Sequence, residues 1–191
     1  MIDILLSTYN GEKYISKQID SILNQTYTEW RLLVRDDCSS DSTLTILKQY
    51  QKKYSDKIYL LSDNINQNIG VIKSFEFLLS QSTNNYIMFC DQDDIWLPNK
   101  IEESIKTIIE LEKTKPHTPI LLHSDLSIID KNEKIIHKSL WKYAGIKPDI
   151  LNHNAKYMAF CNSVTGCTIL MNKQCKTAVL PFPNNIVLYD A

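Results

Sequence analysis

Residues 86–96 read "YIMFCDQDDIW", an apolar run that leads into three carboxylates within four positions, Asp91, Asp93 and Asp94. The run "YIMFC" is short and apolar throughout, as expected for a buried strand of a parallel sheet. Carboxylates this close repel one another, and sharing a site tends to raise one pKa unless a cation neutralises the charge. The stretch therefore predicts a buried strand whose end binds a partner, and a divalent metal is the first candidate.

The same alternation of a short apolar run and a helical pattern occurs three times before this stretch. Strands are expected at residues 2–7, 30–36 and 57–62, and apolar residues recur at helical spacing after each of them. A fourth helical pattern follows the carboxylates. This βαβαβαβα order predicts an α/β fold with a mostly parallel sheet that helices cover on both faces.

The pattern changes after residue 116. Residues 117–136 contain three short β-like runs with a turn at "DKNE", which predicts a small antiparallel addition to the sheet. One more strand is expected in "GCTILMN" (166–172), followed by a helix, whereas residues 141–158 indicate only a loop or short helices. We therefore expect a single domain over residues 1–191, with one half at 1–115 and the other at 116–191.

Composition excludes several classes of protein. The net charge is −1, and the 21 basic residues are scattered, so nucleic acid is not an expected partner. No apolar run approaches the ~20 residues of a membrane helix, so we expect no transmembrane segment. The five cysteines are odd in number and never spaced as CxxC, which leaves zinc and disulfides unsupported. A reducing cytosol is the simplest compartment.

Polar clusters follow all four predicted parallel strands: "STYN" (7–10), "RDDCSSD" (35–41), "DNINQNIG" (63–70) and "DQDD" (91–94). Ligands of an open parallel sheet bind beyond the carboxyl ends of its strands. Because glycine-rich phosphate motifs are missing, we expect Mg²⁺ or Mn²⁺ to bridge carboxylate and phosphate oxygens, with Asp37 and Tyr9 reading the base and sugar. The alternatives are a capped helix at Asp41 and Ser42, a glycine-permitted turn at "NQNIG" and a solvated loop at "DQDD".

Three stretches resemble the nucleotide-sugar domain of family 2 glycosyltransferases with the GT-A fold. They are "ILLSTYNGEKYISKQIDSILNQTYTEWRLLVRDDCSSDST" (4–43), "NQNIG" (66–70) and "MFCDQDDIWLPNKI" (88–101). In the second half, "LLHSDLSIIDKN" and "NSVTGCTILMN" resemble the rhamnosyltransferase-like subgroup. The resemblance implies that residues 1–115 bind the nucleotide sugar and that residues 116–191 form the acceptor side, which we expect to be truncated at its C-terminus.

The resemblance also implies roles for single residues. Thr8 and Tyr9 would line the nucleoside pocket, and Asp37 would accept the imino proton of uracil or thymine. Asn68 and Gly70, from "NQNIG", would belong to the same donor site.

The remaining implied roles concern the sugar, the metal and the general base. Asp91 would lie near the ribose and sugar, Asp93 would ligate the metal, and Asp94 would support their loop. Asp190 in "LYDA" falls where the family carries its general base, although Tyr189 replaces the family's histidine before it.

Together these roles imply an inverting transferase. It would move a sugar from a UDP- or dTDP-linked donor, such as dTDP-rhamnose, to a saccharide or lipid-linked saccharide, with Mg²⁺ or Mn²⁺ as cofactor. The implied location is the cytoplasm, including the inner face of the membrane, with which the protein would associate peripherally. Two other hypotheses are a non-catalytic nucleotide- or carbohydrate-binding module and a DxD-type phosphatase, although a phosphatase would carry its motif after the first strand, where "STYN" stands.

Overall fold

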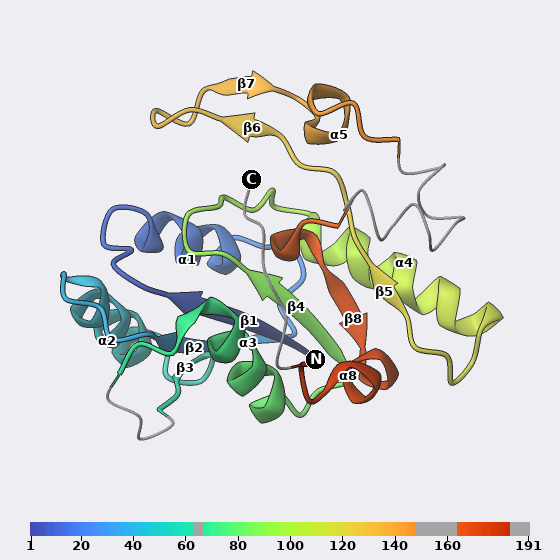
Figure 1. The fold of residues 1–191 in the computed structure, drawn as a ribbon, viewed down its shortest axis with the longest axis horizontal. Coiled ribbons are helices and arrows are strands. Elements are labelled where there is room, and N and C mark those ends of the chain that lie inside the picture. Colours follow the sequence, from blue (N-terminus) through green and yellow to red (C-terminus); the bar gives the residue numbers. More distant parts are fainter. Residues whose placement is uncertain (63–66, 148–163, 184–191) are drawn as a thin grey trace. The chain divides into compact units, whose positions relative to one another are not determined.

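The computed structural model describes residues 1–62, 67–147 and 164–183 (Figure 1). The chain divides into two compact units. Unit 1 contains Met1–Leu122 and Leu170–Ala191, and unit 2 contains His123–Ile169. Each unit is described by itself below.

Unit 1 is built on a six-stranded sheet with the order β3-β2-β1-β4-β8-β5. The strands β1 (Ile2–Thr8), β2 (Trp30–Asp36), β3 (Ile58–Leu60) and β4 (Tyr86–Cys90) are parallel, while β8 (Leu170–Asn172) pairs antiparallel with both β4 and β5 (Leu121–Leu122). The prediction of a mostly parallel sheet is confirmed. Its central strands β1, β2 and β4 end at the same edge, where the polar clusters begin.

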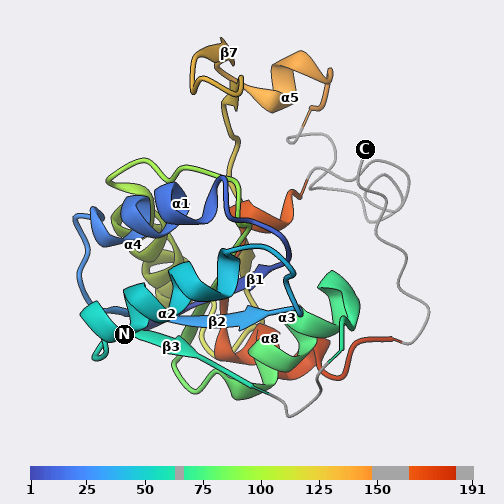
Figure 2. The ribbon, with the colours of Figure 1, turned by 90° about the vertical axis from the view of Figure 1, so that its left-hand side faces the viewer.

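Helices cover both faces of this sheet. Helices α1 (Ile15–Leu23), α2 (Thr43–Lys53) and α4 (Lys100–Thr114) lie on one side, and α3 (Gly70–Gln81) and α8 (Lys173–Val179) lie on the other (Figure 2). Side chains alternate across a strand. The even-numbered residues Ile2, Ile4 and Leu6 of β1 therefore join the cluster formed with α1, α2 and α4.

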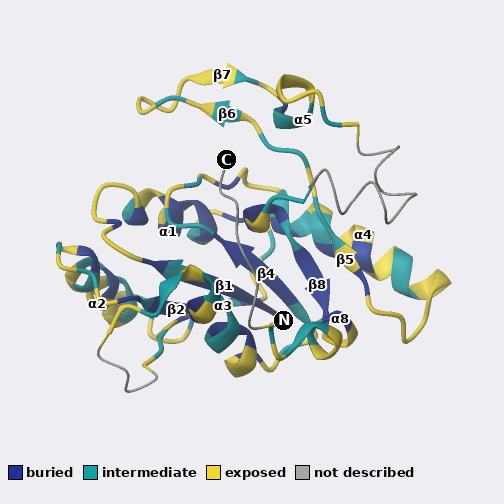
Figure 3. Cartoon of the chain, in the orientation of Figure 1, coloured by how far each residue is buried: buried dark blue, intermediate teal, exposed yellow. Residues whose placement is uncertain are grey.

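The central strands are buried almost completely (Figure 3). Burying an isoleucine or leucine side chain contributes about 1.5–3 kcal/mol, so this core supplies the main driving force for folding. Residues with less than 2% exposure, among them Ile4, Leu32 and Ile19, belong to this core. The sheet is therefore a rigid base for the loops at its edge.

Unit 2 contains a hairpin of β6 (Ile128–Ile129) and β7 (Ile135–His137), followed by α5 (Leu140–Tyr143). The carboxylate of Asp130 closes the turn by accepting hydrogen bonds from the backbone N–H groups of Asn132 (2.8 Å) and Lys134 (2.9 Å). The turn predicted at "DKNE" is thus present.

Two details of the second half differ from the prediction. The expected antiparallel addition is divided, because β5 and β8 join the main sheet whereas β6 and β7 pair with each other. The strand expected over 166–172 is confined to Leu170–Asn172, since Gly166–Thr168 forms a 3₁₀ turn closed by the bond from Thr168 N to Thr165 O (2.9 Å). Among the described residues, no helix combines the length and apolar character that crossing a bilayer would require.

Candidate functional site

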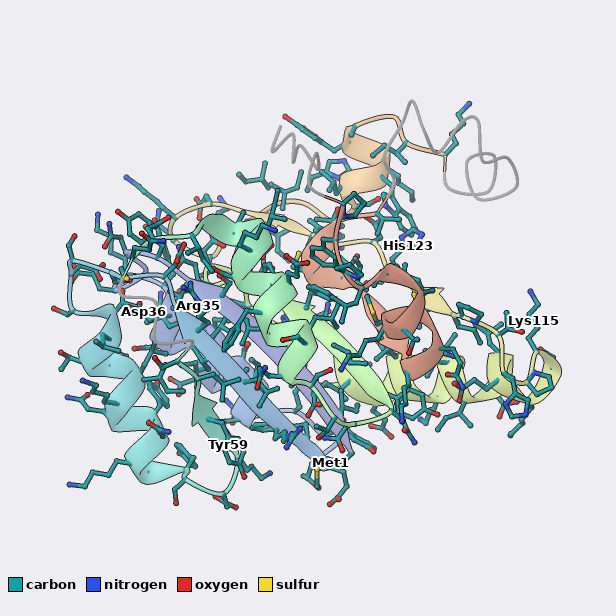
Figure 4. All side chains as sticks on the ribbon, turned by 60° about the horizontal axis from the view of Figure 1, so that its bottom comes forward. Met1, Arg35, Asp36, Tyr59, Lys115 and His123 are labelled. Atoms are coloured by element: carbon teal, nitrogen blue, oxygen red, sulfur yellow. The ribbon has the colours of Figure 1, made fainter. Side chains whose placement is uncertain are left out.

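The candidate site lies at the carboxyl edge of the parallel strands. Figure 4 shows Arg35 and Asp36 at this edge and Met1 at the opposite end of the sheet. The residues after β1, β2 and β4 meet here because β1 lies between the other two strands, with Leu6 opposite both Val34 and Cys90. The convergence expected from the sequence is therefore present for these three loops.

The loop after β1 contacts the loop after β4 through one glutamine. The Oε1 atom of Gln92 accepts hydrogen bonds from Thr8 Oγ1 (2.6 Å) and from Tyr9 N (3.0 Å). Its Nε2 atom donates to Tyr9 O (3.3 Å). Thr8 is only 2% exposed, whereas Tyr9 is 49% exposed. Thr8 is thus buried at the site, whereas Tyr9 is accessible to a ligand.

The loop after β1 also contacts the loop after β2. Asn10 donates its backbone N–H to Ser39 Oγ (2.9 Å), and its side-chain oxygen accepts from Ser40 N (2.9 Å). Asn10 and Cys38 both have left-handed backbone conformations, with φ of 50° and 63°. A positive φ is uncommon outside glycine and is enriched at asparagine. These bonds support the two tight turns that place the loops side by side.

Asp41 caps the following helix. Its carboxylate accepts from Thr43 N (3.0 Å) and also from Glu12 N (3.1 Å). The alternative of a capped helix therefore holds for Asp41. Ser42 itself makes no side-chain capping bond.

Asp36 and Asp37 have different surroundings. Asp36 is partly exposed and accepts from Ser39 Oγ (2.6 Å) and Ser39 N (3.0 Å). Asp37 is 3% exposed and forms a buried ion pair with Arg35, which is 2% exposed.

The other contacts of Asp37 lie at the start of α3. Its carboxylate accepts from Ile69 N (2.8 Å) and Gly70 N (2.8 Å), and its backbone carbonyl accepts from Asn68 Nδ2 (3.1 Å). A carboxylate has about four lone-pair positions. Among the described residues, Arg35, Ile69 and Gly70 account for three of them. The structure thus brings Asp37, Asn68 and Gly70 together. That Asp37 binds a nucleobase stays a prediction.

Gly70 has a φ of 81°, a conformation that glycine adopts at little cost. Gly70 thus has the glycine-permitted conformation, and its N–H donates to Asp37.

The three carboxylates after β4 are not equivalent. Asp91 and Asp94 are partly buried, and a carboxylate oxygen of one lies within 4.8 Å of a carboxylate oxygen of the other. Asp93 is exposed. Two oxygen atoms that bind the same ion at ~2.1 Å lie at most ~4.2 Å apart. Small side-chain rotations would therefore allow Asp91 and Asp94 to bind one Mg²⁺ or Mn²⁺. An all-oxygen donor set suits these ions, and the residues therefore fit the implied metal.

The residue before the carboxylates is not part of this donor set. Burial, followed by the charge of Asp91, raises the pKa of the Cys90 thiol well above its ordinary value. Cys90 therefore stays protonated at neutral pH, and its Sγ accepts a hydrogen bond from Gln18 Nε2 (2.8 Å).

The end of the carboxylate loop is fixed to α1 and to Gln25, which follows that helix. Gln25 donates from Nε2 to Leu97 O (2.8 Å) and accepts at Oε1 from Ile101 N (3.1 Å), while Ser21 Oγ accepts from Trp96 N (3.0 Å). Trp96 is 5% exposed. The loop is thus held at both ends, at β4 and at α1.

Sequence reasoning placed Gln92 and Arg35 within the polar clusters and assigned no role to either. Gln92 is uncharged and lies between two aspartates, so the charge pattern of the sequence does not single it out. Arg35 lies in an apolar strand, where an arginine is usually exposed, and its buried partner Ser74 (2.8 Å) comes from a distant helix. Asp190, the predicted base, lies outside the described residues.

The model of the family described as glycosyl transferase family 2 matches residues 3–161. A beta-1,3-glucosyltransferase of Escherichia coli, WfgD, which is named for UDP-Glc and alpha-D-GlcNAc-diphosphoundecaprenol, is 32% identical over 149 residues, 76% of this chain and 57% of WfgD. The dTDP-rhamnosyl transferase RfbG of Shigella flexneri is 36% identical over 107 residues, 54% of this chain and 37% of RfbG. The chain thus spans about half the length of the curated relatives it matches.

The mannosyltransferase PcManGT of Pyrobaculum calidifontis, solved with GDP-Man and Mn²⁺, superimposes with a TM-score of 0.67 at 14% identity, over 97% of this chain and 48% of that one. At this identity the likeness establishes the fold, which is the GT-A fold. Because the family model covers most of the sequence and the fold agrees with it, the chain belongs to glycosyl transferase family 2.

Proposed function

We propose that the chain binds a UDP- or dTDP-linked sugar and transfers the sugar, with inversion, to a saccharide or lipid-linked saccharide. The observation that carries this proposal is the convergence of Thr8, Tyr9 and the carboxylate loop at one edge of the sheet, joined by Gln92. The names of WfgD and RfbG, which contain UDP-glucose and dTDP-rhamnose, support a pyrimidine nucleotide as the carrier. RfbG also supports rhamnose as one donor sugar.

In this proposal the nucleobase lies against Thr8 and Tyr9, and the Asp37 carboxylate accepts the ring N–H. Asn68 and Gly70 hold Asp37 in place from the start of α3. A site that hydrogen-bonds a specific group of its ligand rejects ligands without that group strongly. Pyrimidine nucleotides should therefore be preferred over purine nucleotides.

The carboxylates supply the second part of the proposal. Asp93, with Asp91 and Asp94, would hold Mg²⁺ or Mn²⁺, which when bound stabilises the negative charge that builds on the leaving diphosphate. Asp190 would take the proton of the acceptor hydroxyl as general base. A single displacement at the anomeric carbon then inverts its configuration.

The diphosphoundecaprenol in the name of WfgD supports a lipid-linked acceptor. The chain would then associate peripherally with the inner face of the membrane, where it would reach such an acceptor from the cytoplasm.

The test is calorimetric titration of UDP, dTDP, ADP and GDP into the chain with and without Mn²⁺. UDP and dTDP should bind in a Mn²⁺-dependent manner, and ADP and GDP should bind at least tenfold more weakly. Asp93→Ala should remove the Mn²⁺ dependence, whereas the control Asp56→Ala, at an exposed aspartate before β3, should not. Equal affinity for all four nucleotides would contradict the proposal, as would an unchanged Mn²⁺ effect in Asp93→Ala.

Metal-dependent release of nucleotide from UDP-glucose or dTDP-rhamnose then separates an enzyme from a binding module. A chain that binds these donors and never releases nucleotide, even with acceptor saccharides present, would favour the non-catalytic hypothesis.

A further inference from the structure

Gln92 occupies the middle position of the run "DQD" and joins this run to the loop after β1. Three hydrogen bonds make the connection: two are accepted by Oε1, from Thr8 Oγ1 (2.6 Å) and Tyr9 N (3.0 Å), and one is donated by Nε2 to Tyr9 O (3.3 Å). We call this group, consisting of Thr8, Tyr9 and Gln92, the Gln92 clasp. It uses both polar ends of the carboxamide, so an aspartate, glutamate or leucine at this position would not reproduce it.

Gly11 makes room for the clasp. A Cβ atom at residue 11 would lie 2.9 Å from Thr8 Oγ1 and closer still to Gln92 Oε1, and both contacts are shorter than real Cβ atoms make. Gly11 is not among the residues with positive φ, so its backbone conformation does not by itself require glycine. The lack of a side chain at this position therefore serves the Gln92 carboxamide.

The two loops that the clasp joins have different tasks in the proposed function. The loop with Thr8 and Tyr9 contacts the nucleoside, and the loop with Asp91, Asp93 and Asp94 contacts the metal. A carboxamide that bonds to one loop from within the other makes the position of each loop depend on the position of the other.

We propose that Gln92 is a positioning residue that couples the nucleoside loop to the metal loop, so that nucleotide and divalent metal strengthen each other's binding. This inference rests on the proposed function. Coupling between two ligands is reciprocal: if Mn²⁺ raises the affinity for UDP by some factor, UDP raises the affinity for Mn²⁺ by the same factor. Direct contact between Mn²⁺ and the diphosphate supplies part of the factor, and the clasp supplies the rest.

The test measures the ratio of UDP affinities with and without saturating Mn²⁺ by calorimetry, and the Mn²⁺ affinity with and without UDP by electron paramagnetic resonance. The variants are Gln92→Leu, which removes the carboxamide, and Gly11→Ala, which displaces it while leaving Gln92 in the sequence. Coupling factors are typically ~5–150-fold. We expect each variant to lower the ratio at least about fivefold.

Two matched pairs separate coupling from a general loss of structure. Gln49→Leu makes the same change on the exposed side of α2 and should leave the ratio unchanged. Thr8→Val removes the hydroxyl that bonds to Gln92 and should lower the ratio, while Thr8→Ser keeps the hydroxyl and should preserve it. Thermal unfolding of each variant checks that the fold is intact.

The possible results decide between three interpretations. If Gln92→Leu and Gly11→Ala keep the wild-type ratio, or weaken UDP binding equally with and without Mn²⁺, the clasp has only a structural role and the inference is wrong. If the unaltered chain binds neither UDP nor dTDP with Mn²⁺, the proposed function fails and this inference fails with it. A lowered ratio in both variants and in Thr8→Val, with Thr8→Ser unaffected, supports it.

Discussion

Asp36 and Asp37 are adjacent in the sequence and differ in what surrounds them. Asp37 is buried against Arg35 and accepts the N–H groups of Ile69 and Gly70, whereas Asp36 contacts Ser39 near the surface. The sequence could not distinguish these surroundings, because both aspartates follow the same strand. What it could predict was the presence of carboxylates at the edge, since a charged cluster after an apolar run is visible without a structure. Uncharged partners such as Gln92 gave no comparable signal.

At this scale we predict that Asp37→Asn destabilises the fold by about 1.5–3 kcal/mol, because it removes the charged acceptor from a buried hydrogen bond with Arg35. Asp36→Asn should cost about 1 kcal/mol or less, since asparagine keeps an oxygen that can accept from Ser39. Urea unfolding at pH 7 measures both. Similar costs for the two variants would show that the Arg35–Asp37 pair is not the buried contact that the structure describes.

Among the elements, the four parallel strands could be predicted to within a few residues. Their apolar runs are continuous because helices bury both faces, and a continuous run has a clear start and end. The antiparallel part could not be predicted in this detail. β5 has two residues and β8 has three, too few for a periodic signal, and the position of β8 between β4 and β5 depends on contacts far apart in the sequence.

The amino ends of β1, β2 and β4 are joined by Asp3, which is fully buried. Its carboxylate accepts from Arg31, from Thr83 N (2.8 Å) and from Asn84 N (3.0 Å) and Nδ2 (2.7 Å). Burial raises the pKa of Asp3, but these hydrogen bonds outweigh burial and hold that pKa below its ordinary value. The ionised carboxylate is therefore the form that stabilises the connection between these strands.

The pH dependence of folding should show this contribution. A depressed pKa in the folded state adds stability above the unfolded pKa of ~3.9, and that stability is lost as pH falls through the folded pKa. We predict that Asp3→Asn lowers the free energy of unfolding by roughly 2–3 kcal/mol at pH 7. The difference between the two proteins should shrink below pH ~4. Urea unfolding of both from pH 7 to pH 2.5 checks this, and a difference that stays constant with pH would contradict it.

For the whole molecule, the parallel sheet and its carboxyl edge belong to unit 1, and the hairpin of β6 and β7 belongs to unit 2. The predicted division at residue 115 into a donor half and an acceptor half remains a prediction. The residues that join the loops at the candidate site, Thr8, Gln92 and Asp37, all lie in unit 1. We therefore expect donor binding to depend on unit 1, while transfer also requires the acceptor-side residues and the base.

Asp190 provides the test that separates binding from turnover. If it is the general base, Asp190→Asn should lower the rate of nucleotide release from UDP-glucose or dTDP-rhamnose by ~10²–10⁴-fold, the usual contribution of such a group. The affinity for UDP with Mn²⁺ should stay within about twofold, because the base contacts the acceptor and not the nucleotide. Asp93→Ala should show the converse pattern, with its main effect on Mn²⁺-dependent binding. Single-turnover rates and calorimetric affinities of the same two variants measure both quantities, and an unchanged rate in Asp190→Asn would mean that another residue takes the proton.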